Sequence, residues 1–273
     1  MSDDKLKLGI MVGSGEDPDV PINRVREVGV TSCQVGWSRS GTVEQGMRLR
    51  AAADAEGIEI TTLWAGLPGR AAWNFVQGPI TIGLVPPDWR QVRTEALQTV
   101  ARVAAEMGVA SITTHVGFLP EYPHDPLFLG ALEALKQVAR TCQQCGVEFW
   151  FETGQETPIT LLRTIQMIGT ENLGINLDPA NLLMYGKGNP CDAVDVFGEW
   201  VRGVHAKDGE YPTDGDNLGE EKPMGQGRVN FPVLIPKLKA KGFRGALTIE
   251  REISGPQQVA DIKSAIELLT PLL

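Results

Sequence analysis

Strand-like and helix-like runs alternate along almost the whole chain, and this alternation limits the folds that the sequence can adopt. Eight short runs rich in β-branched or aromatic residues read as strands, at positions 7–12, 32–37, 58–64, 111–116, 147–152, 173–178, 201–205 and 245–250. Helical patterns accompany them, at 21–29, 42–56, 90–107, 126–145, 158–168, 190–200, 231–241 and 257–270. Eight strand–helix pairs in 273 residues predict an α/β protein that is a single (β/α)8 TIM barrel, with one domain over residues 1–273.

A doubly wound open sheet is the rival architecture for such an alternation. It would normally carry a glycine-rich phosphate-binding turn after the first strand. Here that turn reads VGSGEDPDV, in which Gly13 and Gly15 are not followed by a third glycine in register, and the sequence has no Walker A motif. No linker or low-complexity tract divides the chain. The barrel is therefore the favoured fold.

Composition and charge narrow the class of function. The net charge of −9 argues against a nucleic-acid partner, because binding to a phosphate backbone usually needs a clustered basic surface. No apolar run reaches the roughly 18 residues of a membrane span, and the first residues, MSDDKLK, lack the apolar stretch of a secretory signal. Four cysteines are too few for a disulfide scaffold of this size. We expect a cytoplasmic protein that acts on small molecules, without nucleic-acid or membrane partners.

Four polar residues each end one of the last four predicted strands: Glu152, Asp178, His205 and Glu250. Side chains alternate between the two faces of a strand, which places Trp150, Asn176, Gly203 and Thr248 on the same face as these four. The opposite face is apolar and suits a covering of helices. It comprises Phe149, Phe151, Ile175, Leu177, Val204, Leu247 and Ile249. Three carboxylates converging inside a barrel would repel one another unless a cation neutralised them, so the pattern predicts a divalent-metal site.

Two predicted loops at the carboxyl ends of strands are long, covering residues 65–88 and 207–230. Active sites of (β/α)8 barrels are built at that face, and long loops in compact barrels tend to be functional. Trp73 in the first loop is a candidate to stack on a sugar ring or to exclude water. The alternative is that Trp73 only fixes the loop to the barrel.

Five motifs in the second half of the chain carry a resemblance to a known family. They are FETG (151–154), NLDPAN (176–181), GVHAKD (203–208), GQGRVNFPVLIPKLKAKGF (225–243) and LTIERE (247–252). With them the sequence resembles the sugar isomerase and epimerase branch of the xylose isomerase-like barrel superfamily, often called the sugar phosphate isomerases/epimerases. That branch includes tagatose and psicose 3-epimerases, hydroxypyruvate isomerase and inosose-processing enzymes. The resemblance does not identify a substrate.

The resemblance implies roles for the four polar residues. Glu152, Asp178, His205 and Glu250 match the four metal ligands of the family, for one divalent ion per chain, with Mn²⁺ favoured and Mg²⁺, Co²⁺ or Zn²⁺ as alternatives. Glu152 and Glu250 would also be the catalytic acid/base pair. The implied reaction is proton transfer through a cis-enediolate on a small keto sugar, inosose or related polyol. Return of the proton to the opposite face gives epimerisation, and return to the adjacent carbon gives isomerisation.

Further substrate contacts are expected from His115, Lys207, Asn181 and Arg228, each with a plainer alternative. His115 ends the fourth strand but could be an ordinary core histidine, and Lys207 could instead pair with Asp178 or Glu250. The ketose epimerases commonly carry a histidine where this chain has Asn181, and an arginine where it has Tyr211. These departures weaken assignment to a free-ketohexose 3-epimerase and leave the metal chemistry intact.

Other functions remain open at this point. The same metal and bases could make the protein a lyase or dehydratase of the inosose type or a C-glycoside-cleaving enzyme. A non-catalytic sugar-binding barrel is another class. The superfamily also holds DNA-repair enzymes of the endonuclease IV type, but their three-metal site draws on more histidines than the three in this chain. Whether barrels pair into a homo-oligomer is not decided by the sequence.

Overall fold

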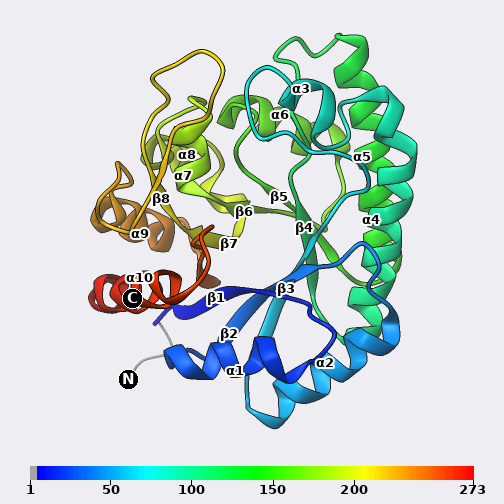
Figure 1. Cartoon of the computed structure of the whole chain (residues 1–273). Helices are drawn as coiled ribbons and strands as arrows, with labels where there is room; N and C mark the ends of the chain where they lie inside the picture. The colour runs from blue at the N-terminus through cyan, green and yellow to red at the C-terminus, as the bar shows by residue number, and fades with distance from the viewer. Residues whose placement is uncertain (1–4) are drawn as a thin grey trace.

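The computed structural model describes residues 5–273 and has the predicted barrel fold (Figure 1). Its parallel strands close in the order β1-β10-β7-β6-β5-β4-β3-β2. They are β1 (Lys7–Gly13), β2 (Ser32–Trp37), β3 (Glu59–Ala65), β4 (Ser111–Thr114), β5 (Glu148–Glu152), β6 (Leu173–Leu177), β7 (Val201–Ala206) and β10 (Ala246–Ile249). All eight lie where the sequence pattern predicts a strand, and the open-sheet alternative is excluded by the closure of β1 on both β2 and β10.

Helices surround the barrel as predicted, and they begin and end at recognisable signals. The main ones are α1 (Asp19–Val28), α2 (Val43–Ala55), α4 (Pro87–Met107), α5 (Pro126–Gln144), α6 (Pro158–Ile168), α8 (Pro190–Phe197), α9 (Phe231–Ala240) and α10 (Pro256–Leu269). Thr42 caps α2 through a capping box with Gln45. Gly108 ends α4 in the left-handed conformation. Among residues 5–273, no helix has the length and apolar character needed to cross a bilayer.

Several short elements were not predicted. They are the helices α3 (Gly78–Thr81) and α7 (Pro179–Met184), the hairpin of β8 (Asp208–Gly209) with β9 (Glu221–Lys222), and the 3₁₀ turn η2 (Thr270–Leu272). The predicted helix at 190–200 ends in a second 3₁₀ turn, η1 (Gly198–Trp200). Several strand ends also differ from prediction by one or two residues. β4 stops before His115, β10 stops before Glu250, and β6 stops before Asp178, whose side chain caps α7 instead of continuing the strand.

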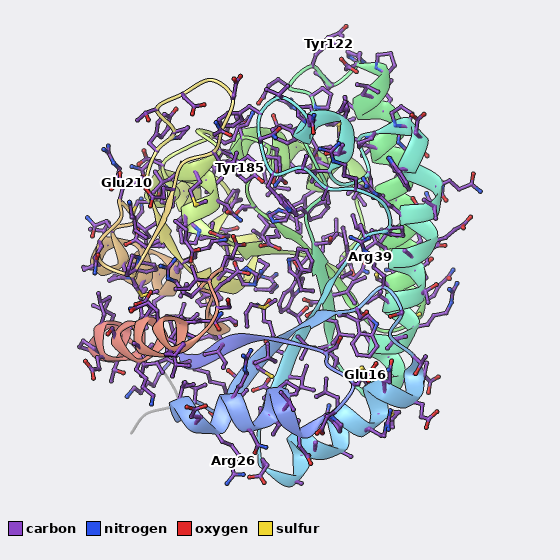
Figure 2. All side chains as sticks on the ribbon, in the orientation of Figure 1. Glu16, Arg26, Arg39, Tyr122, Tyr185 and Glu210 are labelled. Atoms are coloured by element: carbon purple, nitrogen blue, oxygen red, sulfur yellow. The ribbon has the colours of Figure 1, made fainter. Side chains whose placement is uncertain are left out.

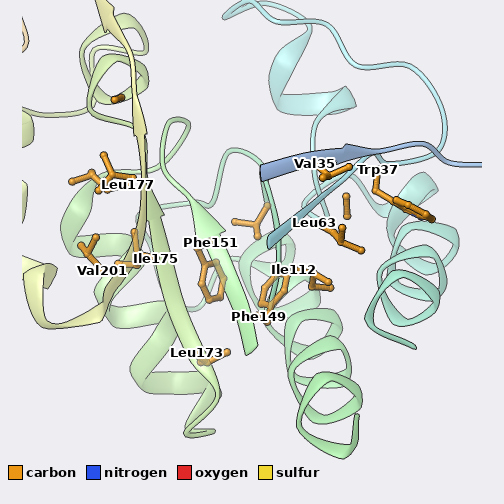
Figure 3. Packing of buried hydrophobic residues seen from close by; sticks show 14 of the residues in the cluster. Val35, Trp37, Leu63, Ile112, Phe149, Phe151, Leu173, Ile175, Leu177 and Val201 are labelled. Carbon is orange, nitrogen blue, oxygen red and sulfur yellow. The ribbon is translucent and has the colours of Figure 1, made fainter. Parts of the chain in front are cut away.

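The two faces of the strands divide as the alternation predicts. Phe149 and Phe151 on β5 pack edge to face, with ring centroids 5.0 Å apart, in the apolar layer between strands and helices (Figure 3). Ile175 and Leu177 of β6 belong to the same layer. The interior of the barrel carries the larger polar groups, so the polar side chains at the strand ends share one enclosed space.

Gly203 on β7 is required by the packing of that interior. A Cβ atom at this position would lie 2.6 Å from Oδ1 of Asn176 and 3.0 Å from the ring of Trp150. Both distances are below or at the limit for non-bonded carbon, so only glycine lets β7 pass these two side chains. Asn176 and Trp150 therefore share Gly203's face of the sheet, as strand alternation predicts.

Gly203→Ala is expected to lower the free energy of unfolding by about 1–3 kcal/mol, the usual cost of overpacking a core. Urea unfolding followed by circular dichroism measures this change. Gly215→Ala is the matched control, because nothing lies within 4 Å of a Cβ added there. Equal unfolding midpoints for Gly203→Ala and the wild type would contradict the tight contact.

Candidate metal centre and active site

The four predicted ligands converge at the carboxyl ends of neighbouring strands. Glu152 is the last residue of β5, Asp178 follows β6, His205 lies near the end of β7, and Glu250 follows β10. One ligand atom from each lies within 4.8 Å of the corresponding atoms of the other three. Three of the side chains are buried, and that of Glu250 is 14% exposed. The predicted geometry at the barrel mouth is therefore present.

Asp178 is held so that one of its oxygens faces the cluster. Its backbone N–H donates to Oγ1 of Thr153 over 2.8 Å, and its Oδ1 accepts the backbone N–H of Asn181 over 2.8 Å. Oδ2 accepts no hydrogen bond within the described chain and lies 3.7 Å from Nζ of Lys207. A buried carboxylate oxygen without a hydrogen bond is costly, and a cation at this point would satisfy it.

His205 is oriented by a chain of amides inside the barrel. Its Nε2 lies 2.8 Å from Oε1 of Gln34, whose Nε2 donates to Oδ1 of Asn176 over 2.9 Å. With that amide orientation Nε2 of His205 carries the proton, and Nδ1 faces Glu152 at 3.1 Å and Glu250 at 3.2 Å. A lone pair aimed at two carboxylates is stable only with a cation or a proton between them.

The charges of the cluster lead to the same conclusion. Burial alone would lower the pKa of His205, but the carboxylates of Glu250 and Glu152 raise it well above its usual value. Burial raises the pKa of Asp178, and the negative charge of Glu250 adds to this despite Lys207. The side chains thus compete for positive charge. Three oxygen donors and one imidazole nitrogen suit a divalent cation such as Mn²⁺ or Mg²⁺, so the residues fit the predicted metal.

Lys207 is buried among carboxylates rather than in open space. Its Nζ is 2.8 Å from Glu252, 3.3 Å from Glu250 and 3.7 Å from Asp178, and its side chain is 1% exposed. Burial would lower the pKa of Lys207, but these carboxylates raise it well above its usual value. The contacts match the alternative prediction, a partner for Asp178 and Glu250. A direct contact between Lys207 and substrate stays a prediction.

Glu152 is positioned by aromatic and imidazole groups. Nε1 of Trp64, at the end of β3, donates to Oε2 of Glu152. Oε1 of Glu152 lies 3.4 Å from Nε2 of His115, and the His115 ring stands edge-on to Trp73 with centroids 5.3 Å apart. Burial would raise the pKa of Glu152, but His115 and His205 lower it, so the carboxylate is ionised at neutral pH.

A hollow of about 370 Å³ opens above the cluster. Its walls are Met11, Trp64, Trp73, His115, Glu152, Asn181, Met184, Tyr185, Leu218, Glu250 and Glu252. The two long loops meet at this end of the barrel (Figure 1), where the backbone N–H of Phe75 donates to the carbonyl of Asp216 over 3.0 Å. Trp73 and Asn181 therefore lie where the sequence predicts substrate contacts, and the loops narrow the entrance.

Asp208 anchors the second long loop. Its carboxylate accepts four backbone N–H groups, with Oδ1 bound to Gly209 and Val229 and Oδ2 to Gly225 and Gly227, at 2.9–3.0 Å. Such a carboxylate replaces the hydrogen bonds that an irregular loop cannot form within itself. The sequence predicted the loop but not this anchor.

The prediction for Arg228 is not supported by its position. Its guanidinium pairs with Glu210, its side chain is 65% exposed, and it lines a hollow beside α9 and α10 that contains none of the predicted ligands. The GQGR segment is turned outward because Asp208 holds the backbone of the residues on either side of Arg228. Arg228 is therefore separated from the barrel mouth.

Trp64, Gln34 and Glu252 also belong to the site, although none of them is among the residues predicted from the sequence. Trp64 lies on the inner face of β3, and Gln34 lies on the inner face of β2. The alternation of side chains along a strand, applied to these two strands as to the last four, indicates both residues. Glu252 lies in the LTIERE motif, two residues after Glu250. Nothing in its local sequence indicates a contact with Lys207.

Comparisons with known proteins agree with the fold. A family model described as xylose isomerase-like TIM barrel matches residues 22–272, and the chain therefore belongs to this family. A xylose isomerase domain protein from Planctomyces limnophilus is 32% identical, with a TM-score of 0.91 over 98% of this chain and 97% of that one. D-psicose 3-epimerase from Clostridium cellulolyticum H10, solved with D-tagatose, is 16% identical, with a TM-score of 0.71 over 98% and 99% of the two chains.

A curated relative is an uncharacterized protein of Methanocaldococcus jannaschii, 24% identical over 176 residues. That match covers 60% of this chain and 58% of the relative. Beyond the family, these likenesses show the fold, and they leave the substrate to be argued from the site.

Glu156 is a second buried acid near the site, between β5 and α6. Its side chain is 1% exposed and forms no ion pair within residues 5–273. Burial raises its pKa to about 8, an effect that its own backbone N–H and the charge of Lys187 only partly offset. The folded chain therefore keeps a proton on Glu156 at pH values where the unfolded chain has lost it.

Glu156→Gln is expected to stabilise the protein above neutral pH. Between the ordinary pKa of 4.5 and about 8 the unfolded state binds fewer protons than the folded state, so the wild type loses stability as pH rises through this window. Glutamine does not titrate, so the Glu156→Gln variant does not lose this stability. Its melting temperature should exceed that of the wild type by an amount that grows from pH 5 to pH 8. The exposed Glu106→Gln variant is the control. A gain independent of pH would contradict the assignment.

Proposed function

We propose that this protein is a divalent-metal-dependent isomerase or epimerase that acts on a small keto sugar, inosose or related polyol. The observation that carries the proposal is the cluster of one imidazole and three carboxylates, with ligand atoms within 4.8 Å of one another below a hollow of about 370 Å³. The aromatic walls from Trp64, Trp73 and Tyr185 suit the apolar face of a sugar. The similarity in fold to a D-psicose 3-epimerase favours this substrate class.

Glu152, Asp178, His205 and Glu250 would hold the cation, and Mn²⁺ is the ion that we propose. When bound, such an ion polarises a carbonyl and makes the neighbouring proton more acidic. Asp178 and His205 are fully buried and have no access to the hollow, which suits ligands that only bind. Glu152 and Glu250 both line the hollow, which suits groups that also meet substrate.

The two glutamates are the proposed acid/base pair. The pKa of Glu250 lies below its usual range because Lys207 and His205 outweigh the effect of burial, so it is ionised and able to accept a proton. Trp64 fixes one oxygen of Glu152 and leaves the other directed toward His205 and His115. If one glutamate removes a proton from a carbon and the other returns a proton to the opposite face of the same carbon, that centre is inverted. If the proton returns to the neighbouring carbon instead, the carbonyl group moves.

Titration with Mn²⁺ should show about one ion bound per chain and a rise in melting temperature, because a ligand that binds only the folded state stabilises it. Asp178→Asn should weaken Mn²⁺ binding at least tenfold, since it removes the charged oxygen that has no other hydrogen bond. Calorimetry gives the affinity, and circular dichroism checks the fold. Asp54→Asn, which removes only an exposed partner of Arg50, is the control. Equal Mn²⁺ affinities in both variants would contradict the site.

Deuterium exchange tests the reaction. With Mn²⁺ bound, the wild type should exchange a substrate proton with D₂O in at least one member of a panel of ketoses and inososes. Glu152→Gln and Glu250→Gln should each slow this exchange by about 10²–10⁴-fold, the usual contribution of a general acid or base. Mass spectrometry separates isomerisation, which conserves mass, from dehydration, which loses water. Undiminished exchange in either variant, with Glu106→Gln as control, would contradict its catalytic role.

A further inference from the structure

A second, smaller hollow of about 70 Å³ adjoins the proposed active site. Trp64, Trp73 and His115 line both hollows, so the two hollows adjoin each other at these three side chains. The remaining lining of the small hollow includes two arginines, Arg39 and Arg93, and no aspartate or glutamate. The charge of the small hollow therefore differs from that of the neighbouring large hollow, which contains the acidic cluster.

Arg39 follows β2, on the same face of the barrel as the metal ligands. Its Cγ lies 3.7 Å from the point that a Cβ on Gly66 would occupy, so its stem packs on the chain just after β3. Figure 2 labels Arg39 beside helix α4, on the other side of the molecule from Glu210. Arg39 is exposed at the rim of the small hollow, and within residues 5–273 its guanidinium forms no ion pair and no side-chain hydrogen bond. Its five N–H donors are therefore available to a ligand.

Arg93 on α4 makes the same hollow more positive. It is 1% exposed and donates to three backbone carbonyls, those of Pro68, Arg70 and Gly83, which fixes both ends of the loop that carries Trp73. It has no carboxylate partner among the described residues. Burial lowers the pKa of Arg93, and the positive charge of Arg39 lowers it further. Because both residues line the small hollow, an anion there would be attracted to both guanidinium groups.

The two hollows carry charged groups of opposite sign. Glu152, Glu250 and Glu252 line the large hollow, whereas the charged groups lining the small hollow, apart from the shared His115, are guanidinium groups. A substrate that reaches from one hollow to the other would meet a cation-binding end and an anion-binding end. Trp64 and Trp73 would contact the carbon chain in between.

We propose that Arg39 is a specificity residue that binds a terminal anionic group of the substrate, a carboxylate or a phosphate monoester, while the carbonyl end lies at the metal site. The proposal rests on the proposed function and narrows its substrate class to acidic sugars. A guanidinium group recognises both anions through paired N–H donors, and its loss should weaken binding of the anionic substrate only.

Three forms of one ketose test the proposal: D-fructose, D-fructuronate and D-fructose 6-phosphate, which differ only in the terminal group. Calorimetry on the Mn²⁺-loaded protein should show at least one of the two acids binding tenfold or more tightly than D-fructose. Arg39→Met should abolish that preference and leave D-fructose binding unchanged, and Arg39→Lys should keep part of it. Arg48→Met, on the exposed face of α2, is the control. The more tightly bound acid tells a carboxylate site from a phosphate site.

Inorganic phosphate and acetate provide a test that does not depend on sugar chemistry. If the proposed function is wrong and no ketose binds or exchanges, at least one of these ions should still bind to the wild type and bind at least tenfold more weakly to Arg39→Met. Anion binding that survives Arg39→Met, or no binding of either ion together with no preference among the ketoses, would overturn the proposal. Arg39-dependent binding of an acid without proton exchange in the wild type would support the anion site and contradict the proposed function.

Discussion

The mutual repulsion of three carboxylates in a nearly dry space is the constraint on which this barrel mouth depends. Glu152, Asp178 and Glu250 are brought together by the closure of the sheet, and each would prefer water or a proton. Lys207 supplies one buried positive charge beside Asp178 and Glu250. Nδ1 of His205 marks where a second is needed, and this is the place that a divalent cation would take.

The barrel wall is built to keep that arrangement rigid. The Gln34 amide binds both His205 and Asn176, so rotation of the imidazole would break its hydrogen bond to an amide that Asn176 holds in place. Gly203 on β7 packs closely against Trp150 and against Asn176, which belongs to this amide chain. The support for the ligands is thus continuous with the core of the protein. A change in volume inside the barrel would alter the site as well as the stability.

The loops above the site are held in place differently from the metal ligands. Each long loop is held by one charged side chain that binds only backbone groups: Asp208 accepts four N–H groups of the 207–230 loop, and Arg93 donates to three carbonyls of the 65–88 loop. Between these anchors the loops touch through Phe75 and Asp216. Residues at the loop tips can therefore differ without disturbing the metal ligands. This is how one scaffold accommodates different substrates.

The sequence alone determined the order of strands and helices, the apolar outer face and the four ligand positions, because these follow from local periodicity and from the last residue of each strand. It also predicted the long loops and a place for Trp73 and Asn181 beside the site. Tertiary structure decided what periodicity does not encode: the contact of Trp64 with Glu152, the pairing of Lys207 with three carboxylates, and the outward position of Arg228. It also left Arg39 without a counter-ion. These outcomes depend on distances between segments far apart in the chain, which closure of the barrel sets and no local pattern contains.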